Sequence, residues 1–71
     1  MAQKLAASLI AGDVVTDQEM IREARRNAYT RVPGDIRVVR NVRTGRKWAH
    51  VTMGNYGVAK VAMDRMVDVA S

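Results

Sequence analysis

Two alternating runs that flank Thr44-Gly45 constrain the fold of this chain more than any other feature. Apolar and polar residues alternate over residues 35–43 and again over residues 46–53. Alternation of this kind is typical of a half-buried strand, and an X-Gly pair between two such strands indicates a two-residue hairpin turn. The sequence therefore predicts an antiparallel hairpin that turns at Thr44-Gly45.

This register predicts two faces of the hairpin, with Arg43 directly opposite Arg46. The outer, mostly polar face then holds Arg37, Val39, Asn41, Arg43, Arg46, Trp48, His50 and Thr52. The inner, apolar face holds Ile36, Val38, Val42, Ala49, Val51 and Met53. The same register points Arg40 and Lys47 at the apolar face. Because a charged side chain is costly to bury, these two residues test the predicted register.

Two amphipathic helices are predicted before the hairpin. Apolar residues recur at helical spacing over residues 2–11, and Gly12 is a natural stop. The segment Thr16-Asp-Gln-Glu19 has the pattern of a capping box, in which the Thr16 hydroxyl and the Glu19 carboxylate bond the first turn of a second helix. That helix is predicted to end near Tyr29, and one of its sides carries Met20, Ile21, Ala24 and Ala28.

The segment after Asn55 is compatible with two structures. Most of its apolar residues fall within half of a helical wheel, which favours a third helix up to residue 70. The alternative is a pair of strands, at residues 57–63 and 66–69, that turns at Asp64-Arg65. Several valines favour this alternative, and it places Tyr56, Val58, Lys60 and Ala62 on one face. The helix separates apolar from polar residues better, so it is the preferred prediction.

The expected fold is a single α+β domain over residues 1–71, in the order α-α-β-β-α, with one antiparallel hairpin packed on helices. The alternative C-terminal strands would instead form a small SH3-like barrel after the helices. A chain of 71 residues buries only about 60% of its unfolded surface. Cysteine is absent, so disulfides cannot add stability. A homodimer is therefore expected.

Positive charge is concentrated in the middle of the chain. Residues 22–47 hold nine of the twelve Lys and Arg residues but only two acids, a net charge of +7. The rest of the chain holds three cations and five acids, a net charge of −2. A local field of this kind attracts polyanions, and arginine in particular binds phosphate or carboxylate through two parallel hydrogen bonds.

Catalysis is not expected. His50 is the only side chain with an unperturbed pKa near neutrality, and neither Ser8 nor Ser71 has a base within predictable reach. Glu19 and Glu23 lie one helical turn apart and could form half a metal site. A cap at Glu19, and a pair between Glu23 and Arg26 or its neighbours on a solvated face, explain them better. The sequence therefore predicts no enzyme, no metal and no cofactor.

The expected function is nucleic-acid binding, to DNA or RNA, in the cytoplasm. Compact, arginine-rich chains without cysteine are common among phage and mobile-element regulators, which suggests that setting. The alternative is a protein-interaction module or inhibitor that docks on an acidic surface of a larger host complex, because Arg and aromatic residues also mark protein interfaces. No apolar run approaches the ~20 residues that cross a membrane, so no membrane partner is expected. The predicted nucleic-acid-binding residues are Arg22, Arg25, Arg26, Arg37, Asn41, Arg43, Arg46, Trp48 and His50.

Overall fold

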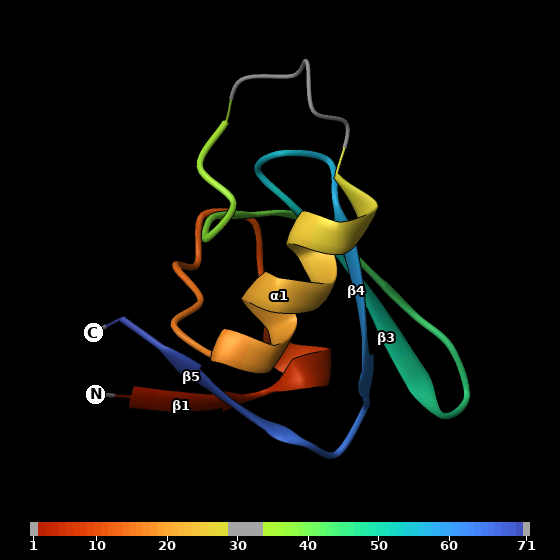
Figure 1. Ribbon diagram of the computed structural model, residues 1–71. Coiled ribbons are helices and arrows are strands. Elements are labelled where there is room, and N and C mark those ends of the chain that lie inside the picture. Colours follow the sequence, from red (N-terminus) through yellow and green to blue (C-terminus); the bar gives the residue numbers. More distant parts are fainter. Residues whose placement is uncertain (1, 29–33, 71) are drawn as a thin grey trace.

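Short antiparallel strands make up most of the regular structure in the computed structural model, which describes residues 2–28 and 34–70 (Figure 1). The elements are β1 (Ala2–Leu5), a 3-10 helix (Ala6–Ser8), α1 (Gln18–Asn27), β2 (Val39–Thr44), β3 (Trp48–Met53), β4 (Val58–Ala62) and β5 (Met66–Val69). The strands form a three-stranded sheet, β2-β3-β4, and a two-stranded sheet, β1-β5. The α+β class is therefore confirmed, although the order of elements differs from the predicted α-α-β-β-α.

The helix predicted over residues 2–11 is wrong. Residues 2–5 form β1, which pairs with β5 from Ala2–Val69 to Leu5–Met66. The chain then makes one 3-10 turn and buries Leu9. A short helix is marginal unless its apolar face packs. Pairing along β5 satisfies backbone groups on both strands, so this tertiary contact overrides the local helical pattern.

The preferred C-terminal helix is also wrong, and the two strands of the alternative are correct. β4 and β5 lie close to the predicted strand bounds, and the turn between them contains Asp64 and Arg65. Two physical terms favour the strands: β-branched valines prefer extended backbone, and an isolated hairpin needs a third strand for stability. The SH3-like barrel of that alternative does not form, because the two sheets are not closed into a barrel.

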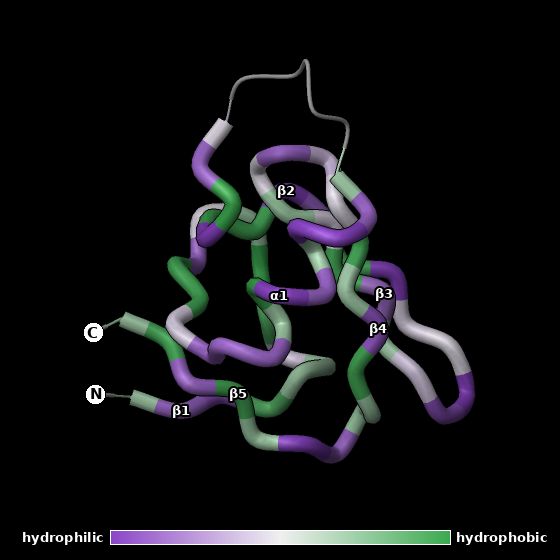
Figure 2. Tube along the Cα trace, in the orientation of Figure 1, coloured by the Kyte–Doolittle hydropathy of each residue, from purple (hydrophilic) through white to green (hydrophobic). Residues whose placement is uncertain are grey.

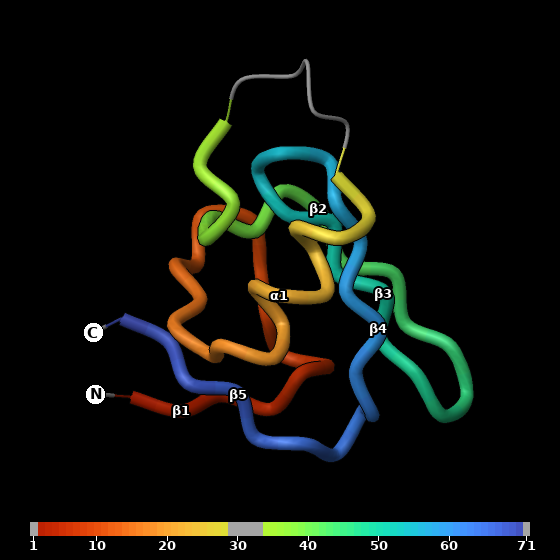
Figure 3. Tube along the Cα trace, viewed as in Figure 1, coloured from red at the N-terminus to blue at the C-terminus, as the bar shows by residue number. Residues whose placement is uncertain are grey.

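A short extended segment at Val14 and Val15 links the two sheets. Val14 makes an antiparallel bridge to Val38, just before β2, while Val15 makes one to Val69 of β5. Figure 3 shows how this segment, in orange, passes beside β5 before α1 begins. Both sheets therefore face one core despite their separate strand ladders.

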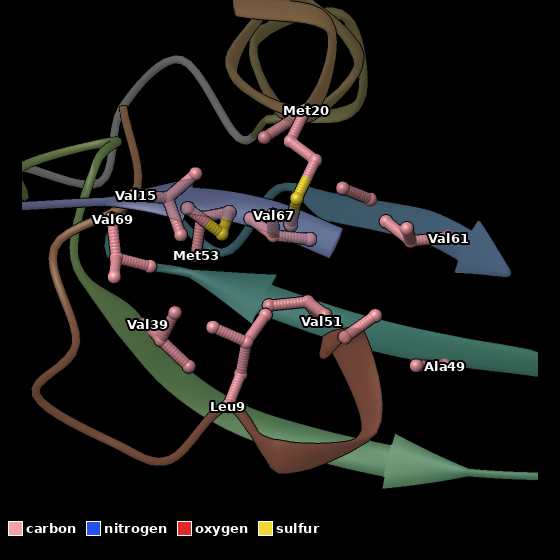
Figure 4. Close-up of a cluster of buried hydrophobic side chains, with 13 residues drawn as sticks. Leu9, Val15, Met20, Val39, Ala49, Val51, Met53, Val61, Val67 and Val69 are labelled. Carbon is pink, nitrogen blue, oxygen red and sulfur yellow. The ribbon is translucent and has the colours of Figure 1, made fainter. Parts of the chain in front are cut away.

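The core lies between α1 and the inner faces of the sheets (Figure 4). Met20 and Ala24 enter it from the helix, and Val51 and Met53 enter it from β3. Figure 2 shows the opposite character at the tip of the β2–β3 hairpin, which is strongly hydrophilic. The predicted apolar side of α1 is confirmed at Met20, Ile21 and Ala24, all of which are buried.

Helix α1 is capped by Asp17 and not by Thr16, so the predicted capping box is wrong. One Asp17 carboxylate oxygen, Oδ1, accepts hydrogen bonds from the backbone N–H of Glu19 at 3.0 Å and of Met20 at 3.2 Å. The other oxygen, Oδ2, accepts one from Arg65 at 2.8 Å. The Thr16 hydroxyl is buried and has no hydrogen-bond partner among the described residues. An aspartate accepts strongly at a helix N-terminus because the helix dipole favours its charge.

This cap gives opposite expectations for two neighbouring substitutions. Asp17→Ala should lower the free energy of unfolding by about 1–2 kcal/mol, because the first turn loses its cap and Arg65 loses a buried partner. Thr16→Val should leave it unchanged or raise it slightly, because it removes an unsatisfied buried hydroxyl. Urea denaturation followed by circular dichroism measures both. The reverse ranking would restore Thr16 as the cap.

Two side chains of α1 also form hydrogen bonds with the backbone of β4, which is an edge strand of its sheet. Glu23 Oε2 accepts a hydrogen bond from the backbone N–H of Lys60 at 2.7 Å, and Asn27 Nδ2 donates one to the carbonyl of Val58 at 2.8 Å. The helix comes this close because Gly57 has no side chain: a methyl group there would overlap the carbonyl oxygen of Ala24. The prediction that Glu23 pairs with Arg26 is therefore wrong.

Candidate functional site

The β2–β3 hairpin turns later than predicted. The observed pairs include Arg43–His50 and Thr44–Ala49, and the Gly45 N–H donates to the carbonyl of Trp48 at 2.9 Å. A two-residue turn of type I′ at Thr44-Gly45 would need positive φ angles, and the described residues adopt positive φ only at Gly12 and Tyr56. Arg43 pairs with His50 and not with the predicted Arg46, a shift of four residues along β3. An even shift leaves the same side chains of β3 pointing outward, so the predicted faces of β3 are correct.

A β-bulge at Arg40 corrects the predicted face of two residues in β2. Val39 pairs with Met53 and is only 1% exposed, and the register shifts before Asn41 pairs with Thr52. Val39 was predicted to face outward and Arg40 inward, and both predictions are wrong. A charged side chain in the core would be costly, and the extra residue of a bulge re-aims it. Arg40 is exposed, and its guanidinium lies 4.1 Å from the centre of the Tyr56 ring.

Arg37 does not belong to the predicted surface, because it precedes β2 and pairs with Asp35. Two hydrogen bonds join their side chains, from Nε to Oδ1 at 3.1 Å and from Nη2 to Oδ2 at 3.0 Å. The bonds from Arg37 lower the pKa of Asp35 below its ordinary value, and the same pairing raises the pKa of Arg37. Both side chains are exposed, so the pair adds little stability, but it occupies the guanidinium.

The outer face of the β2-β3-β4 sheet brings basic side chains from all three strands together. Arg43 lies opposite His50, which in turn lies opposite Lys60; we call these three residues the basic row. The row is flanked by Trp48. This residue is 43% exposed, and its ring centre lies 4.4 Å from the Lys60 ammonium. No acid is present among the residues of this outer face, which are Asn41, Arg43, Trp48, His50, Thr52, Val58, Lys60 and Ala62.

The tip of the hairpin extends this surface. Arg46 and Lys47 are both exposed in the turn. Together with Trp48 they line shallow hollows on the surface, one reaching His50 and another reaching Ala62 and the acid Asp64. Lys47, which the predicted register pointed at the apolar face, is therefore a surface cation. The indole of Trp48 thus stands between the cations of the tip and those of the basic row.

The basic helix residues Arg22, Arg25 and Arg26 are all exposed on α1. Arg22 and Arg26 line a groove between α1 and β4, and Lys60 lines the same groove. The groove also contains Glu19, which was predicted to serve the cap but lies 3.2 Å from Arg65 in an ion pair. Arg22 and Arg26 therefore adjoin the outer face at Lys60, across a groove that contains both basic and acidic side chains.

Most cations of the described chain are free of ion pairs. Within residues 2–28 and 34–70, the ion pairs engage only Lys4, Arg37 and Arg65 as cations. The cations outside these pairs are Arg22, Arg25, Arg26, Arg40, Arg43, Arg46, Lys47 and Lys60. This distribution leaves the outward residues of the β2-β3-β4 sheet positive, whereas α1 carries two acids, Glu19 and Glu23, among its three arginines.

The sequence prediction missed Lys60 and the pair of Arg40 with Tyr56. The signal for Lys60 was present, because the strand alternative for residues 57–63 placed it on one face with Val58 and Ala62. No local pattern marks a bulge such as the one at Arg40. The structure brings together Asn41, Arg43, Trp48 and His50 as predicted, with Arg46 at the tip.

The chemistry available at this surface is the binding of anions and of flat aromatic groups. No group of three or more His, Asp or Glu side chains in the described part of the chain could hold a metal ion. Among the same residues, no helix is long and apolar enough to cross a bilayer. Comparison with known protein families, with curated proteins and with solved structures finds no match.

Proposed function

We propose that the protein binds nucleic acid through the outer face of the β2-β3-β4 sheet and the tip of the β2–β3 hairpin. The observation that carries the proposal is the basic row, Arg43, His50 and Lys60, which lies beside Trp48 where the outward residues of the three strands include no acid. Neighbouring strands lie about 4.8 Å apart, so the backbones that carry the row span about 10 Å. That is close to one Debye length at physiological salt, so its cations act together on a polyanion.

The open shape of this surface suits phosphate better than a small metabolite. Hollows beside Trp48 are shallow and open, whereas small-molecule sites are concave and mostly apolar. Exposed arginines can bind phosphate oxygens through two parallel hydrogen bonds. The helix cations Arg22 and Arg26 would extend the footprint beyond Lys60, towards a longer polyanion.

The proposal predicts a steep dependence of affinity on salt. If Arg43, Arg46, Lys47 and Lys60 each contact one phosphate, the logarithm of the binding constant should fall with the logarithm of salt concentration with a slope of about −3 to −4. Fluorescence anisotropy with labelled duplex and single-stranded oligonucleotides measures this slope. The salt concentration is varied from roughly 20 to roughly 300 mM, because affinity changes steeply over this range. Absence of binding to every duplex and single strand at low salt would exclude the proposal.

An acidic protein surface is the second candidate partner. The observation that favours it is the exposure of Trp48 and Tyr56 beside arginines, a combination that is also enriched in protein–protein interfaces. A pull-down from nuclease-treated extract that retains one stoichiometric protein, with no retardation of nucleic acid, would replace the first proposal with this one. A role as a phage or mobile-element regulator and the expected homodimer stay predictions, and sedimentation at micromolar concentration decides the dimer.

A further inference from the structure

A second pair of a cation and an aromatic ring lies at the far end of the outer face. At the hairpin-tip end the Lys60 ammonium lies over the Trp48 ring. At the other end the Arg40 guanidinium lies over the Tyr56 ring, 4.1 Å from its centre. Both rings are partly open to solvent, with exposed fractions of 43% for Trp48 and 39% for Tyr56. The outer face therefore carries one exposed aromatic ring at each end.

Arg40 joins the outer side of β2 to Tyr56. Val39 and Val42 both point inward, and the bulge between them leaves Arg40 and Asn41 exposed on the outer side. The ring of Tyr56 lies 4.1 Å from that guanidinium, so it stands beside Arg40 at this end of the sheet. Arg40 also donates a hydrogen bond to the carbonyl of Gly54 at 3.4 Å, which ties it to the turn that presents Tyr56.

The backbone of Tyr56 is unusual. Its φ is +61°, and it is the only residue other than glycine with a positive φ in the described part of the chain. The turn is held by hydrogen bonds from the Met53 N–H to the Gly57 carbonyl at 2.8 Å and from the Gly57 N–H to Asn55 Oδ1 at 3.0 Å. Glycine or asparagine adopts this conformation with less strain. A large aromatic side chain at a strained position points to function.

The two rings are far enough apart to contact different nucleotides. Trp48 and Thr52 are four residues apart on β3, about 13 Å at the rise of an antiparallel strand. Thr52 pairs with Val58, and Tyr56 lies further along, in the turn before Val58. The cations of the basic row and Asn41 lie between the two ends.

We propose that the ligand of this face is a single-stranded nucleic acid, with one unpaired base stacked on Trp48 and another on Tyr56. The inference rests on the proposed function and names the ligand class. Each ring is partly open to solvent, and Lys60 and Arg40, which lie over the rings, would contact the phosphates next to the stacked bases. A base in a duplex is already stacked, so duplex DNA would meet the cations and gain nothing from the rings. Stacking tolerates every base, because each has a flat aromatic surface.

Tyr56→Asn is the decisive variant, because asparagine suits the positive φ but offers no ring. It should fold at least as well as the parent protein, yet its affinity for an oligothymidylate should fall about tenfold, the loss expected for one stacked base. Tyr56→Phe keeps the ring and should retain the affinity. Trp48→Leu should cause a similar loss, whereas binding to a duplex of the same length should change less than twofold in every variant.

A series of oligothymidylates of increasing length tests the spacing of the two rings. Affinity for the parent protein should rise until one strand reaches both rings, and for Tyr56→Asn the rise should end at a shorter length. Binding of single strands should quench the fluorescence of Trp48, the only tryptophan of the chain, and duplex should not.

The outcomes separate this inference from the proposed function. Equal binding of single strand and duplex, unchanged by Tyr56→Asn, would refute stacking and leave nucleic-acid binding intact. Equal losses for both ligands in Tyr56→Asn would show that the residue acts through the turn, which also refutes stacking. Failure of every nucleic acid to bind would refute both proposals together.

Discussion

Reversing two charges of the basic row, in Arg43→Glu with Lys60→Glu, is expected to lower the affinity for nucleic acid by about 100-fold at physiological salt. Each reversal removes one phosphate contact and adds a repulsive charge, an effect of about 1.4 kcal/mol or tenfold for each residue. The salt dependence should become shallower at the same time, because fewer counterions are released. Both side chains are exposed, so the variant should keep the fold, which circular dichroism checks.

Arg37 supplies a matched control for Arg43. Both are exposed arginines near β2, and replacing either by Glu changes the net charge equally, but the guanidinium of Arg37 is bound to Asp35 outside the outer face. Arg37→Glu should therefore change affinity less than about threefold, a small part of the effect of losing a phosphate contact. Equal losses for Arg37→Glu and Arg43→Glu would mean that net charge alone drives binding, and the outer face would lose its special role.

Gly57→Ala is expected to lower the free energy of unfolding by about 3 kcal/mol or more. The new methyl group would overlap the carbonyl oxygen of Ala24, a backbone atom of α1 that no rotamer change can move away. Overpacking costs about 1–3 kcal/mol even where side chains can adjust, and separating the helix from β4 would also weaken the bonds from Glu23 and Asn27 to the strand edge. A domain of this size has a total stability on the order of 4–10 kcal/mol.

Gly45→Ala is the control for this substitution. A methyl group at Gly45 would meet the carbonyl oxygen of Trp48 at 3.5 Å, an ordinary contact, and the φ of Gly45 is not positive. This variant should be as stable as the parent or slightly more stable, because alanine restricts the unfolded chain. Urea midpoints for the two variants give the comparison. Similar midpoints would show that α1 can move away from β4 at little cost.

The hairpin shows how far the sequence could predict this fold. The alternation in Ala49, Val51 and Met53 correctly identified the buried face of β3, because one face of an antiparallel sheet is apolar and the other polar. The prediction placed the turn too early. Thr44-Gly45 has the composition of a two-residue turn, but such a turn also needs positive φ angles, and the residue types alone do not fix these angles. The bulge at Arg40 follows from the cost of burying a guanidinium. A strictly alternating pattern of apolar and polar residues along one β-strand does not predict such an extra residue.

The helix and strand errors have a different cause. The spacing of Val58, Ala59 and Ala62 fits one side of a helix, and short apolar runs of this kind do not distinguish helix from strand. The partner strands decide the outcome: β4 adds to β3, and β5 lies between β1 and Val15. This choice also placed Lys60 in the candidate site, so the main gap in the predicted surface came from an error in secondary structure and not from an error in chemistry.

The pairing of β1 with β5 has a practical consequence for the outer face. Ala2 lies opposite Val69, so the two ends of the described chain leave the molecule side by side, on the opposite side from the β2–β3 hairpin in Figure 1. A reporter, a surface tether or a second copy of the protein joined to either end would extend away from the basic row. Tandem repeats linked in this way would present several such faces to one polymer, with a gain in avidity set by the length and stiffness of the linker.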